Sequence, residues 1–128
     1  MKLIPLLRVK NIKVAIAFYT RVLDYELKYP DEELNIFCVD LINGEAELQL
    51  SETDGISGIA VNVLVDNVDR LFRKYIKQGL ITPKKENSPV HEGPINQTWG
   101  RREFYVTDAD GNTLRFTQPI NNVLEQQK

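Results

Sequence analysis

The stretch from Trp99 to Pro119, WGRREFYVTDADGNTLRFTQP, holds most of the side chains that could do chemistry. Asp108 and Asp110 stand two residues apart, as a pair of carboxylates would in acid–base catalysis. Both belong to the turn signal that ends in Gly111, and hydrogen bonds within such a turn explain the two carboxylates better. Arg115 follows in a strand-like run, where its guanidinium could form a charge-assisted hydrogen bond to a ligand.

Three further residues are candidates by their type. Trp99 offers a flat apolar ring with one N–H donor, which suits stacking on a planar ligand or, equally well, closing the end of the core. His91 is the only histidine, and a lone loop histidine is more often exposed to solvent than catalytic or metal-binding. Cys38 lies between Phe37 and Val39 and fits a buried strand better than a catalytic thiol. Sequence patterns for nucleophilic hydrolysis, nucleotide binding and dithiol chemistry are absent.

The bulk composition argues against two classes of partner. The chain of 128 residues has 16 basic and 18 acidic side chains, a net charge of −2 and a pI of about 5.4. No excess of positive charge is available to attract nucleic acid. The apolar stretches are too short for a membrane span or a secretory signal. We therefore expect a cytoplasmic protein without a nucleic-acid or membrane partner.

The elements that must position the candidate side chains occur twice along the chain. Each half reads as a strand, an amphipathic helix, a short extended segment and a β-hairpin. The helices begin at Asn11 and at position 66 or 67, where a polar side chain can cap the first turn. The hairpins turn at Asn43-Gly44 and at Asp110-Gly111. The order β-α-β-β-β is thus predicted twice.

This order predicts an α+β fold of two βαβββ modules, about residues 1–52 and 57–119, within a single domain of residues 1–128. In each module, a mixed and mostly antiparallel sheet would carry its helix on the outer face and leave the other face free. If the two free faces curve toward each other, the modules form a concave sheet around a small-molecule cavity.

Three polar segments fall outside these elements. Residues 83–100 are rich in Pro, Gly, Asn and Ser, account for the greater length of the second module, and are a candidate lid or rim of the cavity. The acidic residues 31–33 are typical of a solvated turn. The polar tail 121–128 is expected to fray or to lie over a neighbour.

Two segments in this duplicated order carry a resemblance to a known family. IPLLRVKNIKVAIAFYTRVLDYEL and TWGRREFYVTDADGNTLRFTQ resemble the vicinal oxygen chelate superfamily, and within it the glyoxalase and bleomycin resistance protein branch. The resemblance covers residues 3–118. The superfamily includes lyases, isomerases, dioxygenases, thiol transferases and binding proteins, so the resemblance implies the fold and leaves the activity open. Because two subunits commonly share their pockets in such relatives, it also implies a homodimer.

Enzymes of this superfamily hold a divalent metal with His, Glu or Gln side chains from four strands. The resemblance places these four positions at Ile4, Gln49, Ala60 and Arg115. Aliphatic side chains have no lone pair and a guanidinium has only donors, so Gln49 alone could bind a metal. A catalytic metal needs about three protein ligands. We therefore expect no metal, no cofactor and no catalytic residue.

Strand alternation selects the side chains that should face a ligand. Arg115 stands between Leu114 and Phe116, so it points away from them and into the cavity if those two residues pack under the helix. The same alternation, together with the position of Trp99 at the end of the long loop, gives the predicted ligand-binding set. It consists of Ile4, Leu6, Arg8, Gln49, Asn62, Trp99 and Arg115.

The resulting prediction is a metal-independent small-molecule binding protein, similar to the bleomycin resistance proteins, that sequesters its ligand in the cavity. Positive charge from Arg8 and Arg115 favours a neutral or anionic, aromatic ligand. One alternative is a metal-dependent, glyoxalase-like lyase or a dioxygenase, in which Glu47 and His91 would join Gln49. Another is an interaction module whose cavity is filled by its own loop or by a partner.

Overall fold

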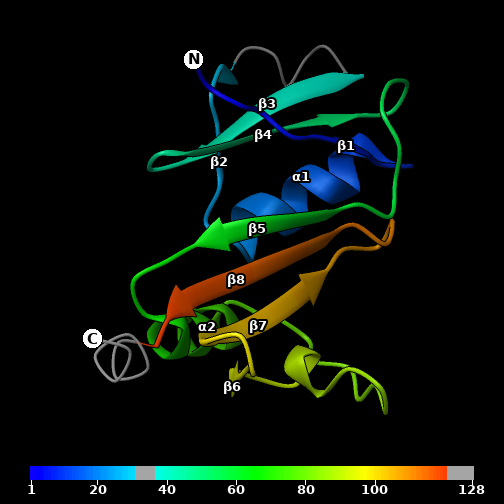
Figure 1. Ribbon diagram of the computed structural model, residues 1–128. Coiled ribbons are helices and arrows are strands. Elements are labelled where there is room, and N and C mark those ends of the chain that lie inside the picture. Colours follow the sequence, from blue (N-terminus) through cyan, green and yellow to red (C-terminus); the bar gives the residue numbers. More distant parts are fainter. Residues whose placement is uncertain (31–36, 121–128) are drawn as a thin grey trace. The chain divides into compact units, whose positions relative to one another are not determined.

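The computed structural model describes residues 1–30 and 37–120 (Figure 1). The predicted acidic turn at 31–33 and the tail 121–128 lie outside the described residues. The elements in chain order are β1 (Leu6–Arg8), α1 (Ile12–Arg21), β2 (Glu26–Leu27), β3 (Cys38–Asn43), β4 (Ala46–Ser51), β5 (Ala60–Leu64), α2 (Val68–Lys77), the 3-10 helix η2 (Pro89–His91), β6 (Ile95–Asn96), β7 (Arg101–Thr107) and β8 (Thr113–Pro119). No helix of the described residues is both long enough and apolar enough to cross a membrane.

The strands form two four-stranded sheets, with the orders β1-β4-β3-β2 and β5-β8-β7-β6. In the first sheet β1 runs parallel to β4, whereas β3 is antiparallel to both β4 and β2. In the second sheet β6 is antiparallel to β7. The predicted α+β class and the two βαβββ modules are therefore confirmed. A cavity shared by both modules stays a prediction.

The chain forms two compact units whose borders differ from those of the modules. Met1–Val61 clusters with Thr107–Thr113, and the second unit contains Asn62–Val106 and the chain from Leu114 onward. The β7–β8 turn thus belongs to the unit that contains α1. The contacts of Asp108 and Asn112 explain this assignment.

Asp108 ties the β7–β8 turn together and attaches it to α1. One carboxylate oxygen accepts hydrogen bonds from the backbone N–H groups of Asp110 (2.8 Å) and Asn112 (2.9 Å), as an Asx turn requires. The other accepts from the buried Tyr19 hydroxyl at 2.8 Å. Burial and the nearby Asp108 carboxylate raise the pKa of Tyr19, so this hydroxyl stays protonated and donates. Asp110 accepts from the Lys10 backbone N–H at 2.8 Å. Both carboxylates are structural, as the turn signal predicts.

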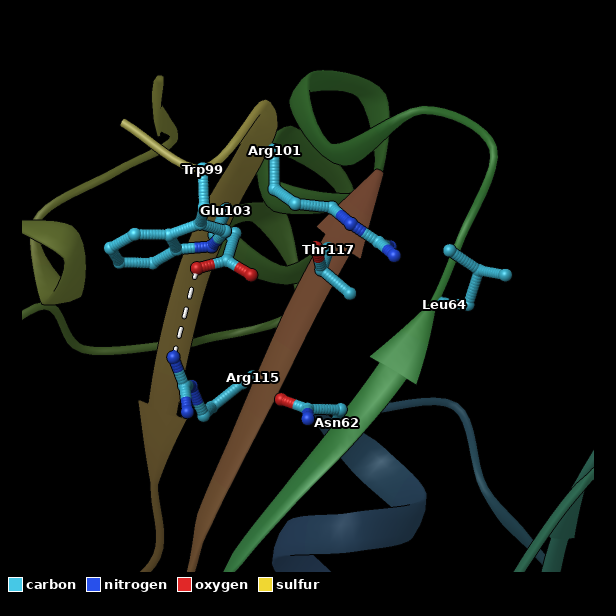
Figure 2. Close-up of a pocket in the computed structure, with 7 residues that line it drawn as sticks. All are labelled: Asn62, Leu64, Trp99, Arg101, Glu103, Arg115 and Thr117. Carbon is cyan, nitrogen blue, oxygen red and sulfur yellow. Dashed lines mark ion pairs between the residues drawn. The ribbon is translucent and has the colours of Figure 1, made fainter. Parts of the chain in front are cut away.

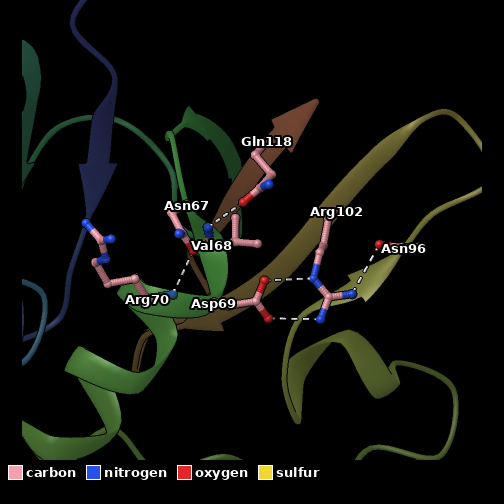
Figure 3. Close-up of polar contacts among 7 residues, drawn as sticks. All are labelled: Asn67, Val68, Asp69, Arg70, Asn96, Arg102 and Gln118. Atoms are coloured by element: carbon pink, nitrogen blue, oxygen red, sulfur yellow. Dashed lines mark hydrogen bonds and ion pairs between the residues drawn. The ribbon is translucent and has the colours of Figure 1, made fainter. Parts of the chain in front are cut away.

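In the second unit, two side chains cap the first turn of α2 (Figure 3). The Asn67 side chain accepts from the Arg70 backbone N–H at 3.0 Å. The Val68 N–H donates to the Gln118 side chain at 2.6 Å, which joins the helix start to the end of β8. These contacts satisfy two donors that an isolated helix end would leave open.

Side chains of α2 cover one face of the second sheet. The rings of Phe72 and Tyr75 contact Phe104 of β7 edge-on, and Tyr75 also contacts Phe116 of β8. Asp69 forms a two-point ion pair with Arg102 of β7, at 2.9 and 3.0 Å (Figure 3). The helix therefore fixes which face of β7 and β8 is buried.

We expect Asn112→Ala to destabilise the fold by about 2–4 kcal/mol, because Asn112 is fully buried and several partners would lose their hydrogen bond. Its amide donates to the Arg8 carbonyl (3.0 Å) and to Asp108 (3.1 Å) and accepts from the Ile59 N–H (3.3 Å). Urea unfolding measures the loss. The same change at the exposed Asn87 is the control, and equal effects at the two sites would contradict the role of Asn112.

Candidate functional site

The face of the second sheet opposite α2 carries polar and charged side chains. Strand alternation sends them there because Phe104, Leu114 and Phe116, which lie between them in sequence, are buried on the helix side. Together with Trp99 they line a hollow of about 360 Å³ (Figure 2). The lining residues are Asn62 and Leu64 of β5, Arg101 and Glu103 of β7, Arg115 and Thr117 of β8, and Trp99.

Arg115 is held at this hollow by Glu103 and Tyr105. Its Nη2 donates a short hydrogen bond to the Tyr105 hydroxyl, and its guanidinium carbon lies 4.6 Å from the centre of the Tyr105 ring. The Tyr105 hydroxyl donates to Glu103 Oε1 at 3.1 Å, and Arg115 Nη2 lies 3.9 Å from the same oxygen (Figure 2). Burial raises the pKa of Tyr105, which keeps the phenol protonated. Arg115 thus lies on the face opposite the buried Leu114 and Phe116, and its predicted place in a cavity shared by both modules stays a prediction.

Two buried polar atoms at the hollow have no hydrogen-bond partner among the described residues. They are Nε of Arg115 and Oγ1 of Thr117. Buried donors are nearly always satisfied in folded proteins, by protein, by water or by a ligand. Both residues line the hollow, which puts the two atoms next to the space that a bound molecule would occupy.

Trp99 is 57% exposed and lines the hollow. The alternative in which its ring closes the end of the core is therefore wrong. A flat ring exposed beside a hollow is suited to stacking on a planar ligand. Whether it does so stays a prediction.

His91 lies in the long loop, in η2, but it is buried, so the expectation of an exposed side chain is wrong. Its Nδ1 is 2.8 Å from the Ser88 hydroxyl, and its ring contacts Tyr105 edge-on at 5.7 Å. Burial lowers the pKa of His91, which favours the neutral ring at neutral pH. The histidine thus supports the ring on which Arg115 rests. A lid role for residues 83–100 stays a prediction.

Four predicted ligand-binding residues belong to the first unit. Leu6 pairs with Gln49 between β1 and β4, and the Gln49 amide donates to Asp40 at 3.3 Å. Ile4 and Arg8 are exposed. A second hollow, of about 330 Å³, is lined by Arg8, Val9, Lys10, Glu52, Ser57 and Asp110.

The structure therefore gathers Asn62, Trp99 and Arg115 at one hollow. Sequence reasoning missed Arg101, Glu103 and Thr117 there. Strand alternation predicts that Thr117, two residues after Arg115, lies on the same face of β8. The same alternation places Arg101 and Glu103 on one face of β7. Roles of the predicted set in binding stay predictions.

The family model of the Glyoxalase/Bleomycin resistance protein/Dioxygenase superfamily matches residues 4–116. The chain belongs to this superfamily. No curated protein matches it closely enough to be counted as a relative.

Several solved structures have the same fold. A bleomycin-binding protein complexed with bleomycin superposes with a TM-score of 0.72 at 21% identity, over 92% of this chain and 98% of that chain. A bleomycin resistance determinant encoded on transposon Tn5 gives 0.72 at 20% identity, over 93% and 98%. TioX from Micromonospora sp. ML1 gives 0.73 at 20% identity, over 93% and 98%. At such identities the likeness shows the fold alone.

The side chains at the four positions that the sequence resemblance predicts as metal ligands do not fit a metal ion. Ile4 and Ala60 are aliphatic and Arg115 is a cation that donates to Tyr105, so only the Gln49 amide oxygen could bind a metal. Within residues 1–30 and 37–120, no group of three or more His, Cys, Asp or Glu side chains could hold a metal.

Glu47, the carboxylate nearest in sequence to Gln49, is occupied by two lysines. Its side chain is 1% exposed, and its oxygens lie 2.5 Å from Lys28 Nζ and 3.3 Å from Lys2 Nζ. Lys28, followed by Lys2, holds the pKa of Glu47 below its ordinary value of 4.5. Leaving this carboxylate unpaired would be costly, so it serves the fold of the first sheet.

We expect Glu47→Gln to flatten the acid limb of the stability profile. A lowered folded-state pKa means that the charged Glu47 contributes stability above pH 4.5, and that this contribution is lost as the pH falls through the folded-state pKa. Urea unfolding between pH 3 and pH 7 measures it. Glu45→Gln, at an exposed turn position, should leave the limb unchanged. An acid limb as steep in Glu47→Gln as in the wild type would refute the assignment.

Proposed function

We propose that the chain is a small-molecule binding protein that works without a metal and sequesters a planar ligand in the hollow of the second sheet. One observation carries the proposal: the exposed Trp99 ring borders a hollow whose walls carry Arg101 and Arg115. An apolar platform with a few directed polar groups is typical of small-molecule sites. Relatives with this fold include a bleomycin-binding protein, which supports a binding role and a place in antibiotic resistance.

The charges at the hollow favour a neutral or anionic ligand. The lining contains two guanidinium groups, of Arg101 and Arg115, and one carboxylate, that of Glu103. Glu103 is already paired with Arg115 and Tyr105, so the excess charge open to a ligand is positive. A strongly cationic ligand would be repelled.

The enzymatic alternative, a glyoxalase-like lyase or a dioxygenase, depends on a metal. Of its candidate ligands, Glu47 is paired with Lys28 and Lys2, and Nδ1 of His91 contacts the Ser88 hydroxyl. The contacts of these candidate metal ligands support a binding function over metal-dependent catalysis. A homodimer and a cytoplasmic location remain part of the proposal.

We expect Trp99→Ala to weaken binding of planar aromatic compounds about tenfold through loss of ring stacking. The exposed ring contributes little to the core, so the melting temperature should stay unchanged. Isothermal titration calorimetry on a set of naphthalene derivatives measures the affinity. Phe37→Ala is the matched control, because Phe37 is 56% exposed against 57% for Trp99 and does not line the hollow. Equal affinities for both variants and the wild type would remove Trp99 from the site.

We expect protein purified without chelators to contain far less than one divalent ion per chain. Elemental analysis measures this. Adding Zn²⁺, Ni²⁺ or Mn²⁺ should leave the melting temperature unchanged, since a site that binds the folded state would raise it. A stoichiometric ion whose removal lowers the melting temperature would overturn the metal-free proposal.

A further inference from the structure

We propose that the hollow recognises the carboxylate of a planar aromatic acid through two donors, Arg115 Nε and Thr117 Oγ1. This inference rests on the proposed function and specifies its ligand class. It starts from the two polar atoms that the described part of the chain leaves unsatisfied. Both belong to β8 and line the same hollow.

Thr117 is the clearer of the two atoms. Its residue is 5% exposed, and its hydroxyl has no hydrogen-bond partner among residues 1–30 and 37–120. A buried hydroxyl without a partner destabilises the fold, and valine has nearly the same shape without that cost. The next threonine on this face, Thr113, differs, because its hydroxyl lies 2.8 Å from that of Thr107. The Thr117 hydroxyl is therefore open to a hydrogen bond with a ligand in the hollow.

Arg115 lines the same hollow and has a buried N–H donor, Nε, without a partner in the described part of the chain. One edge of its guanidinium is engaged by Tyr105 and lies near Glu103, and the group lies over the Tyr105 ring. This support fixes the group while Nε stays buried without a partner. Planar, fixed guanidinium donors match the two oxygens of a carboxylate.

One carboxylate oxygen at the hollow has a donor, whereas the donors Arg115 Nε and Thr117 Oγ1 have no acceptor among the described residues. Glu103 Oε1 accepts from the Tyr105 hydroxyl. Because Arg115 and Thr117 stand two residues apart on one strand face, their polar groups point to the same side. The oxygens of a ligand carboxylate would accept hydrogen bonds from Arg115 Nε and Thr117 Oγ1. The Trp99 ring, which lines the same hollow, can stack on the aromatic part of the ligand.

The experiment compares three naphthalene probes by calorimetry: naphthalene-2-carboxylate, naphthalene-2-carboxamide and naphthalen-2-ylmethylammonium. We expect the carboxylate to bind at least about tenfold more tightly than the other two, since hydrogen bonds to charged groups are the stronger ones. Equal affinities for all three would overturn the carboxylate recognition and leave the binding function standing. Absence of binding by every probe would overturn the binding function as well.

Thr117→Val gives the sharper test, because stability and binding should move in opposite directions. We expect its melting temperature to rise by about 3 °C and its affinity for the carboxylate to fall about tenfold. Thr113→Val, which breaks the hydroxyl pair with Thr107, should lower the melting temperature and leave affinity unchanged. A Thr117→Val variant with unchanged carboxylate affinity would overturn the proposal.

Two further variants keep the inference testable if valine disturbs the fold. Thr117→Ser retains the hydroxyl and should retain the affinity of the wild type. Arg115→Lys keeps a positive charge beside Glu103 but removes the Nε donor, so it should lose the preference for the carboxylate over the amide. Wild-type preference in Arg115→Lys would contradict the role of Nε.

Discussion

The candidate site depends on one constraint, the alternation of side chains along β8. Leu114 and Phe116 are buried against the helix side of the sheet, and Tyr75 of α2 contacts Phe116 directly. Because successive residues of a strand point to opposite faces, Arg115 and Thr117 must face away from α2. A shift of one residue in register would bury the guanidinium and expose both apolar side chains. The packing of an apolar face thus determines where the polar chemistry lies.

Contacts among Glu103, Tyr105 and Arg115 hold the Arg115 guanidinium in place. Tyr105 donates to Glu103 and accepts from Arg115, so each group satisfies a neighbour in a partly buried environment. The His91 ring, in the long loop, contacts the Tyr105 ring edge-on. A buried charge needs such partners, and the same partners restrict the guanidinium to one orientation. Stability and specificity therefore come from the same contacts here.

Membership in the superfamily determines the framework and leaves the chemistry to individual side chains. The fold matches solved structures at about one fifth identity. At the four positions that the sequence resemblance predicts as metal ligands, this chain has aliphatic, amide and guanidinium groups. The same framework can thus present a cation and an aromatic ring instead of a metal, which suits binding more than catalysis.

Local signals in the sequence were sufficient for the elements and for the orientation of Arg115. Helix caps at Asn11 and Asn67, turn residues and strand alternation all depend on neighbours in sequence. Other properties depend on residues far away in the chain. Burial of His91, exposure of Trp99 and the pairing of Glu103 with Arg115 arise from packing between the loop, β7 and β8. Only the tertiary structure could decide them, because burial and partner choice depend on which distant segments meet, and composition and periodicity do not encode that.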